Sequence, residues 1–342
     1  MTPFEAQLDH LRHAPQRWAL TGVGGFIGSH LLETLLELDQ VVVGLDDFSS
    51  GRRENLADVR RRVGEARWAR FSLVEGDVRD PETCRRVCAG ASRVLHQAAL
   101  VSVPRSIEDP LLTQQVNVDG FLNILLAARE AGAQRVVYAS SSAVYGDGPV
   151  QPKVEDDLGA PLSPYALSKL MDEQLAALCD RLYGQSAIGL RYFNVFGPRQ
   201  DPEGAYAAVI PKWIERLKGG DPCVIFGDGE TSRDFCYVGD IVQANLRAAL
   251  APQGTPSRAF NVGRGESTTL NELFRILRQG VEVRLPGRVC AEARHEAARA
   301  GDIRHSRADL SQIQGALGYA AKGTVAQGLA DTLDWYLAPA RS

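Results

Sequence analysis

The chain has 342 residues, of which 44% are apolar and 23% are charged, and its net charge is −4. This composition is typical of a soluble globular protein, and the length suits either one large domain with a smaller partner or two ordinary domains. Acidic and basic residues are interspersed, which argues against a nucleic-acid-binding protein, because such a protein presents a basic face. The N-terminus lacks a cationic segment followed by an apolar stretch, and no apolar run approaches the ~20 residues of a membrane span. We therefore expect a cytoplasmic protein with no nucleic-acid or membrane partner.

Strands and helices alternate in the first half of the chain. Short apolar segments predict strands at 18–20, 41–45, 71–74, 94–95, 135–138 and 188–190, and longer periodic segments predict helices at 26–38, 111–131 and 165–183. Short apolar strands separated by helices imply a parallel sheet that is covered on both faces. We therefore predict an α/β protein with a Rossmann-type, doubly wound sheet.

The pattern changes after about residue 190. Gly and Pro clusters interrupt the second half, and its predicted helices, at 211–218, 240–250, 270–277 and 325–337, no longer alternate cleanly with strands. The sequence therefore predicts a division into residues 1–190, which form the sheet domain, and residues 191–342, which form a smaller mixed α/β lobe. Segments between about 233 and 263 are expected to return to the main sheet.

A glycine-rich segment joins the first predicted strand to the first predicted helix. Its glycines let the backbone turn tightly and bring amides against a pyrophosphate at the helix N-terminus. The predicted contacts are Gly22, Gly25, Phe26, Ile27 and Gly28. Asp46 ends the second strand about twenty residues later, where a carboxylate accepts hydrogen bonds from the adenosine ribose and repels a 2′-phosphate. We therefore predict NAD rather than NADP, although Arg52 and Arg53 lie nearby.

Cysteines and metal ligands are scattered. The spacing of the cysteines matches no zinc motif, so we predict free thiols in a reducing compartment and no metal site. The six cysteines are Cys84, Cys88, Cys179, Cys223, Cys236 and Cys290.

Tyr165 and Lys169 lie four residues apart in a predicted helix and therefore share one face of it. A tyrosine normally titrates near pH ~10, but an ammonium beneath the ring and a cationic nicotinamide beside it would stabilise the phenolate. Such a phenol can act as a base near neutral pH. Because this spacing is common by chance, a tyrosine packed over a lysine stem is the ordinary alternative, and the surrounding motifs must decide.

Taken in order, these motifs resemble the extended short-chain dehydrogenase/reductase family and, within it, the nucleotide-sugar 4-epimerases. The resemblance covers nearly the whole chain, through residues 21–28, 46–51, 76–78, 96–99, 117, 140–146, 165–169, 191–198, 227–235 and 299–302. It implies that the first lobe binds NAD and the second a nucleotide sugar, and that Asn117 steadies the sheet. The further NAD contacts it implies are Asp47, Ser50, Gly51, Asp77, Val78, Gln97, Ala98, Ala99, Tyr165 and Lys169.

The resemblance also implies a catalytic set. Tyr165 would take a proton from a sugar hydroxyl while hydride passes to NAD, and Ser141, the first choice, or Ser142 would bind the same oxygen. Lys169 would hold the nicotinamide ribose. Related dehydratases carry an Asp-Glu pair, and some decarboxylases a Glu, where this chain has Ser142 and Ala143. Alanine transfers no proton, so elimination is disfavoured and a redox-neutral epimerisation at C4 remains.

A pyrophosphate needs cationic donors, and guanidinium groups supply them well. The resemblance places Arg233, Arg299 and the Asn194 amide on the pyrophosphate, Asp302 on the nucleoside ribose, and residues 205–211 with 224–226 along the base, which is uracil in most relatives. The substrate contacts it implies are Ser102, Ser141, Ser142, Tyr165, Asn194, Val209, Arg233, Arg299, Asp302 and Ser306.

Ser306 bears on the choice of sugar. UDP-galactose-specific relatives have a bulky tyrosine at the matching position, which fills the space that an N-acetyl group needs. Serine leaves that space open, which permits the larger group without requiring it, and Ser306 is alternatively an ordinary helix cap. Val101 departs from the glycine that close relatives often have beside the sugar.

The resulting hypothesis is an epimerase that interconverts UDP-GlcNAc and UDP-GalNAc. The alternatives are a UDP-glucose/UDP-galactose or UDP-uronate 4-epimerase and, more distantly, a nucleotide-sugar dehydratase or decarboxylase, or a non-catalytic NAD-binding protein. The family pairs subunits through the two helices that match 111–131 and 165–183, so a homodimer is expected by analogy.

Overall fold

The computed structural model describes residues 2–203, 208–298 and 303–338. Its main sheet is parallel throughout, with the strand order β11-β6-β5-β4-β1-β2-β3. The strands are β1 (Arg17–Thr21), β2 (Val41–Asp46), β3 (Phe71–Glu75), β4 (Arg93–His96), β5 (Arg135–Ser141), β6 (Ala187–Tyr192) and β11 (Ala259–Val262). The order reverses between β1 and β4, so the predicted doubly wound α/β fold is confirmed.

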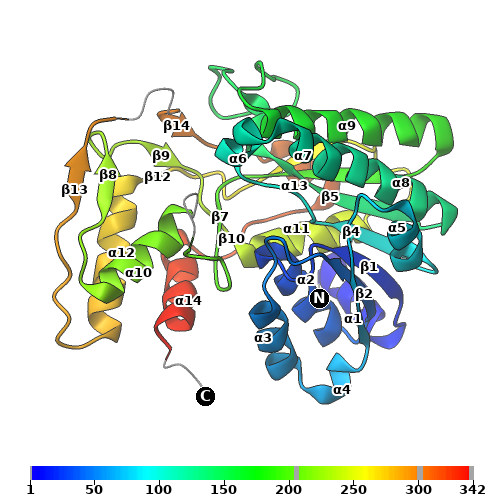
Figure 1. The fold of residues 1–342 in the computed structure, drawn as a ribbon, viewed down its shortest axis with the longest axis horizontal. Coiled ribbons are helices and arrows are strands. Elements are labelled where there is room, and N and C mark those ends of the chain that lie inside the picture. The colour runs from blue at the N-terminus through cyan, green and yellow to red at the C-terminus, as the bar shows by residue number, and fades with distance from the viewer. Residues whose placement is uncertain (1, 204–207, 299–302, 339–342) are drawn as a thin grey trace.

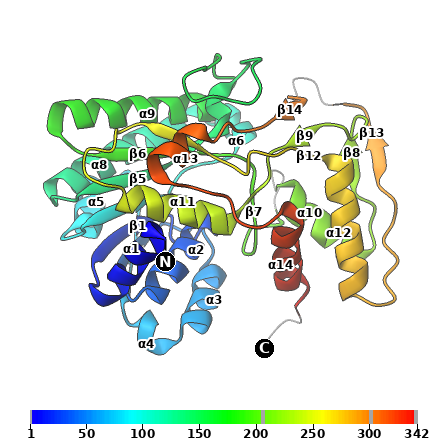
Figure 2. The same ribbon diagram turned by 180° about the vertical axis from the view of Figure 1, so that it is seen from behind.

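Helices cover both faces of this sheet. Figure 1 shows α5, α8 and α9 along one face, and Figure 2, turned by 180°, shows α11 in front of the other face with α1 and α2 beside it. Short apolar strands with a helix on either side bury most strand side chains, as a parallel sheet requires, except in the edge strand β3, which has none that is fully buried. These helices and their neighbours are α1 (Pro3–His13), α2 (Phe26–Glu37), α3 (Arg53–Val63), α4 (Glu65–Trp68), α5 (Pro81–Cys88), α6 (Val103–Glu108), α8 (Gly120–Glu130), α9 (Pro164–Tyr183), α11 (Val238–Leu250) and α13 (Ser311–Leu317).

The helix predicted at 111–131 is present, but it contains a π-helical turn that the sequence did not predict. It begins as α7 (Pro110–Gln114), widens into a π-helical turn η1 (Gln115–Asp119) and resumes as α8. Within the wide turn, Asn117 turns its amide away from the helix: its Oδ1 accepts from the Leu100 amide at 2.8 Å and its Nδ2 donates to the Leu100 carbonyl at 3.1 Å. No Pro or Gly interrupts this turn, so the sequence gives no sign of it.

The smaller lobe lies beside the carboxyl ends of the strands and contains α10 (Val209–Gly219), α12 (Leu270–Arg284) and α14 (Val325–Leu337) (Figure 1). Its helices share an apolar core of their own, centred on Trp213, Phe274 and Leu333. Its strands are very short: β7 (Val195–Phe196), β8 (Val224–Phe226), β9 (Ser232–Arg233), β10 (Cys236–Tyr237), β12 (Thr268–Thr269), β13 (Arg294–Glu296) and β14 (His305–Ser306).

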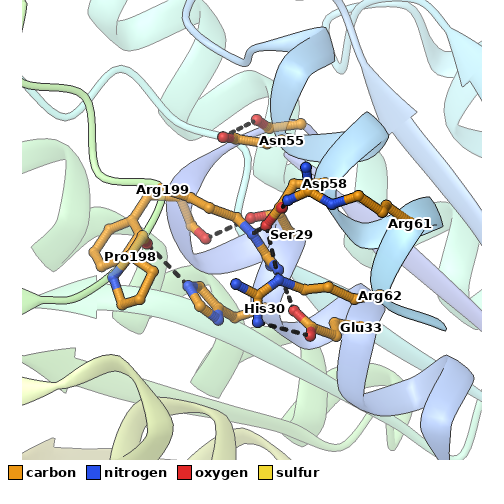
Figure 3. A network of polar contacts seen from close by, with 11 residues as sticks. Ser29, His30, Glu33, Asn55, Asp58, Arg61, Arg62, Pro198 and Arg199 are labelled. Atoms are coloured by element: carbon orange, nitrogen blue, oxygen red, sulfur yellow. Dashed lines mark hydrogen bonds and ion pairs between the residues drawn. The ribbon is translucent and has the colours of Figure 1, made fainter. Parts of the chain in front are cut away.

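A buried ionic cluster joins the loop after β7 to the first lobe (Figure 3). The Arg199 side chain is 1% exposed, its Nε donates to Asp58 Oδ2 of α3 at 2.8 Å, and its Nη2 pairs with Glu33 of α2. His30 of α2 bonds the Pro198 carbonyl through Nε2 at 2.9 Å. Arg199 also has a left-handed backbone, with φ at 65°. The cluster therefore fixes the chain where it enters the smaller lobe.

Within the described residues, no helix is long and apolar enough to cross a membrane. All six cysteines are buried free thiols, as predicted. No cluster of three or more His, Cys, Asp or Glu side chains with a geometry suited to a metal ion occurs in 2–203, 208–298 or 303–338.

Candidate active site

The turn between β1 and α2 can be formed only by glycine at two positions. Gly22 has φ at +68°, and a Cβ on it would lie 2.7 Å from the Ala98 amide nitrogen. A Cβ on Gly28 would lie 2.0 Å from the Gly22 carbonyl oxygen. Gly25 is the N-cap of α2 and supplies no side-chain cap, so the amides of Phe26, Ile27 and Gly28 begin the helix without one. Uncapped amides at a helix N-terminus suit a phosphate.

Asp46 ends β2 at the edge of this turn and is buried. Its Oδ2 accepts from the Gly24 amide at 2.8 Å and its Oδ1 accepts from the Phe48 amide at 2.8 Å, while burial raises the pKa of the carboxyl. A Cβ on Gly51 would come within 2.5 Å of Asp46 Oδ1, so glycine is required there too. The carboxylate thus organises the loop that surrounds the expected ribose position.

A pocket opens where the strands β1 to β4 end, because parallel strands have their carboxyl ends at one edge of the sheet. The predicted residues Gly22, Asp46, Asp47, Ser50, Asp77, Val78, Ala98 and Ala99 line it, together with Leu45, Ser49, Gly76, Leu100 and Val116. Of the added residues, Val116 could not be anticipated, because it reaches the pocket from the π-helical turn.

Two predicted cofactor residues have side chains engaged with the protein. Asp77 binds the Arg79 guanidinium at 2.8 and 2.5 Å, and this bond lowers the pKa of its carboxyl. Gln97 bonds Tyr192 and Asn245 at 3.1 and 3.2 Å. Asp77 is thus held in the pocket wall by Arg79, whereas Gln97 is not among the residues that line the pocket.

The two arginines that favoured NADP have other partners. Arg52 pairs with Asp201 at 2.9 Å, and Arg53 pairs with Glu75 at 2.7 Å and stacks over the Phe48 ring. Their charges are thus balanced by carboxylates, which supports the reading of Asp46 as a determinant for NAD.

Tyr165 lies in the first turn of α9, and three hydrogen bonds hold that turn in place. The Tyr165 amide donates to Ser106 Oγ of α6 at 3.1 Å, and the Tyr165 carbonyl accepts from Ser168 Oγ at 2.8 Å. Ser168 Oγ in turn accepts from Asn117 Nδ2 at 3.0 Å. Asn117 therefore connects the loop after β4 to the first turn of α9, rather than acting on the sheet alone. Lys169, one turn later, is buried.

The serine run ends β5 and turns into a 3₁₀ segment, η2 (Ser142–Tyr145). Ser140 points into the protein and donates to Glu173 of α9. Ser141 Oγ accepts from the Ala143 amide at 3.1 Å, and Ser142 starts the 3₁₀ turn. Glu173 also accepts two hydrogen bonds from Arg191 of β6, at 2.9 and 2.7 Å. Together with the bond from Ser140, these contacts connect β5, β6 and α9 next to the serine run.

The predicted substrate residues lie on several short elements. Asn194 Nδ2 donates to the Asp234 carbonyl at 3.2 Å, and Arg233 Nη1 donates to the Ser232 carbonyl at 3.0 Å. Ser306 lies in β14, whose register places it opposite Arg233 of β9, so the alternative of a helix cap is wrong. Ser102 caps α6 and Val209 begins α10. Arg299 and Asp302 lie outside the described residues.

Comparison with known proteins agrees with this geometry. The family model described as "NAD dependent epimerase/dehydratase family" matches residues 18–263. The chain belongs to the NAD dependent epimerase/dehydratase family. It is 38% identical over 324 residues to a UDP-glucose 4-epimerase of Mycolicibacterium smegmatis, which covers 94% of this chain and 98% of the relative.

Two solved structures of family members are also similar. One is a UDP-N-acetylglucosamine 4-epimerase from Methanobrevibacter ruminantium in complex with UDP-N-acetylmuramic acid, with 35% identity, a TM-score of 0.86 and coverage of 94% and 98%. The other is a Thermus thermophilus UDP-glucose 4-epimerase in complex with NAD, with 33% identity, a TM-score of 0.80 and coverage of 94% and 99%.

NAD is the cofactor of this enzyme family, and the site fits it. The glycines that leave no room for a Cβ, the uncapped start of α2 and the buried Asp46 together form a dinucleotide cradle. Sequence reasoning missed the supports of this family site, namely Ser106, Ser168 and Glu173. Only their contacts reveal them: Ser106 of α6 meets the start of α9, and Ser168 and Glu173 of α9 bond Asn117 and Ser140. These contacts depend on the tertiary fold.

Proposed function

We propose that this enzyme is a UDP-N-acetylglucosamine 4-epimerase, which interconverts UDP-GlcNAc and UDP-GalNAc. The observation that carries the choice of sugar is Ser306, a small residue in β14 opposite Arg233. The N-acetyl group would lie beside Ser306, while Arg233 and Asn194 would meet the pyrophosphate. The 35% identity to the Methanobrevibacter enzyme supports the proposal.

Tyr165 would remove the proton from the C4 hydroxyl of the sugar, and Ser141, with Ser142 beside it, would hold the same oxygen by a hydrogen bond. NAD, when bound, supplies the hydride acceptor and donor for C4. Lys169 would hold the nicotinamide ribose and stabilise negative charge on the Tyr165 oxygen. The protein would let the keto sugar rotate about its pyrophosphate link, and Tyr165 would return the proton to the opposite epimer.

Ser142 and Ala143 support epimerisation over elimination. A dehydratase needs an additional acid and base beside the sugar, and the 3₁₀ turn that follows Ser141 offers a hydroxyl and a methyl group instead. The six buried free thiols support a reducing, cytoplasmic location. We also propose that residues 1–190 with the returning β11 hold NAD, and that 191–342 hold the nucleotide sugar.

The substrate proposal is tested by comparing UDP-GlcNAc with UDP-glucose in wild type and Ser306→Tyr. Wild type is expected to turn over UDP-GlcNAc faster. The tyrosine is expected to lower kcat/KM for UDP-GlcNAc at least ~10-fold while leaving UDP-glucose nearly unchanged, because it removes space that only the N-acetyl group needs. Faster wild-type turnover of UDP-glucose would reject the proposal.

That outcome would instead support a UDP-glucose 4-epimerase, the second candidate, which the 38% identity to the Mycolicibacterium enzyme favours. A UDP-uronate 4-epimerase is the third candidate, and it is distinguished by measuring the turnover of UDP-glucuronic acid in the same assay.

We further propose a homodimer formed through α7, α8 and α9. These helices expose Leu111, Leu126, Leu167, Leu178 and Leu182. In α9 the exposed leucines are spaced by 11 and 4 residues, which places them on one face. Leu182→Glu is expected to give a monomer by light scattering, whereas Val283→Glu, at a still more exposed position of α12, should remain dimeric. A monomeric wild type would refute the dimer.

A further inference from the structure

A buried carboxylate lies directly behind the catalytic lysine. Asp172 follows Lys169 by three residues on α9, and their side chains are 1% and 2% exposed. Lys169 Nζ donates to Asp172 Oδ2 at 3.2 Å. Asp172 Oδ1 is buried and, among the described residues, has no hydrogen-bond partner. Lys169 supplies the one positive charge that acts on this acid, while the neighbouring Glu173 carboxylate acts in the opposite direction.

The other groups around this pair do not replace the lysine as counterion. Glu173 is occupied by Arg191 and Ser140, and Tyr138 of β5 is a buried neutral phenol whose pKa is raised by burial. His96 of β4 bonds Thr21 at 2.7 Å, and its Nε2 is also buried without a partner in the described chain. Burial and then the charge of Lys169 lower the pKa of His96 to about 3, so it is neutral.

Two opposing effects determine the pKa of the Asp172 carboxyl. Burial raises the pKa of its carboxyl to about 7, while Lys169 acts in the opposite direction. Above this pH the pair is an ion pair, and below it a neutral acid stands beside an uncompensated ammonium. The charge that Lys169 presents to its surroundings therefore depends on Asp172.

We propose that Asp172 is a positioning residue for Lys169. The Asp172 carboxylate holds the Lys169 ammonium in its buried place and offsets part of the positive potential that this ammonium exerts at Tyr165. This role rests on the proposed function, in which Lys169 stabilises negative charge on the Tyr165 oxygen. Asp172→Asn removes the offsetting charge and keeps the side-chain shape. Above about pH 7, where the wild-type Asp172 carries its charge, negative charge at Tyr165 then becomes easier to form in the variant. The acidic limb of the kcat/KM profile should therefore move to lower pH by up to about one unit.

The first test needs no activity. The Asp172 carboxyl is titrated by carbon NMR in protein labelled at the aspartate side chains, with Asp172→Asn for assignment. A midpoint near neutral pH that rises in Lys169→Met, where the stabilising ammonium is gone, supports the proposal. A midpoint in the ordinary aspartate range near ~4, or one that does not respond to Lys169→Met, overturns it. The titration midpoint of Asp172 in the wild-type protein can be measured even if a variant folds poorly.

The second test is the pH profile of Asp172→Asn beside Asp180→Asn, which removes an acid two turns later on the same helix. Only Asp172→Asn should move the acidic limb. An unmoved limb in an otherwise active Asp172→Asn enzyme overturns the proposed influence on Tyr165, whereas a wild type that turns over no UDP-sugar counts against the proposed function. In that case the NMR titration still decides the coupling of Asp172 to Lys169.

Discussion

The two lobes differ in what holds them together. The first is a seven-stranded parallel ladder with strands of four to seven residues, whose side chains are packed between two helical layers. The second has strands of two or three residues and depends on helix packing and on polar contacts such as the Arg199 cluster. The cofactor cradle is thus built by backbone geometry at the edge of the sheet, whereas the proposed substrate side is assembled from side chains on short elements.

The largest effect is expected at Tyr165 in α9, which belongs to the first lobe. Tyr165→Phe should lower kcat by about 10³-fold with little change in stability, because only the phenolic oxygen is lost. Tyr183→Phe, at the exposed end of the same helix, is the control and should retain wild-type turnover. Near-full activity in Tyr165→Phe would refute the proposed acid/base role.

The cradle itself is tested by Gly22→Ala, which we expect to lower the NAD retained by the purified protein at least ~10-fold. The added methyl group would meet the Ala98 backbone at 2.7 Å. Gly132→Ala has nearly the same backbone, with φ at +67°, but no atom within 4 Å of the new Cβ. Gly132→Ala therefore introduces the same backbone strain without a steric clash. The NAD content of each variant is measured after denaturation, and equal contents would contradict the proposed role of Gly22.

The connection between the lobes is tested by Arg199→Met. Glu33 and Asp58 would then lose their buried cation and keep only the half-exposed Arg61 and Arg62 as partners, at a cost of about 1.5–3 kcal/mol in the free energy of unfolding. Arg67→Met removes an exposed arginine that pairs with Asp39 at 3.4 Å, and it should cost under ~1 kcal/mol. Urea unfolding measures both. Similar losses would mean that the buried cluster does not specially stabilise the junction.

The smallest effect concerns pH. Burial, followed by the charge of Arg199, lowers the pKa of His30 to about 4 from its ordinary 6.5, so the folded state favours the neutral ring. This contribution to stability is complete above about pH 6.5 and is lost as the pH falls toward 4, since the unfolded chain takes up the proton first. His30→Gln should therefore flatten the decline of unfolding free energy in this window. An unchanged slope would exclude His30 as a source of acid sensitivity.

The sequence predicts the first lobe well because its signals are local and repeated. Apolar strands, the glycine turn at 22–28 and Asp46 at a strand end each restrict the backbone to few conformations. Residues 195–196 and 232–233 form strands too short to show any periodicity, so only pairing in the folded chain defines them. The π-helical turn at Asn117 and the burial of Asp172 against Lys169 likewise arise from tertiary contacts, which no local pattern encodes.

The central claim is a self-contained epimerase in which NAD is retained and regenerated within each turnover. The most direct test incubates purified protein with UDP-GlcNAc and no added cofactor and resolves the two epimers over time. Formation of UDP-GalNAc to equilibrium, over many turnovers per active site and without net production of NADH, is the predicted result. A strict need for NAD in amounts stoichiometric with product would contradict it.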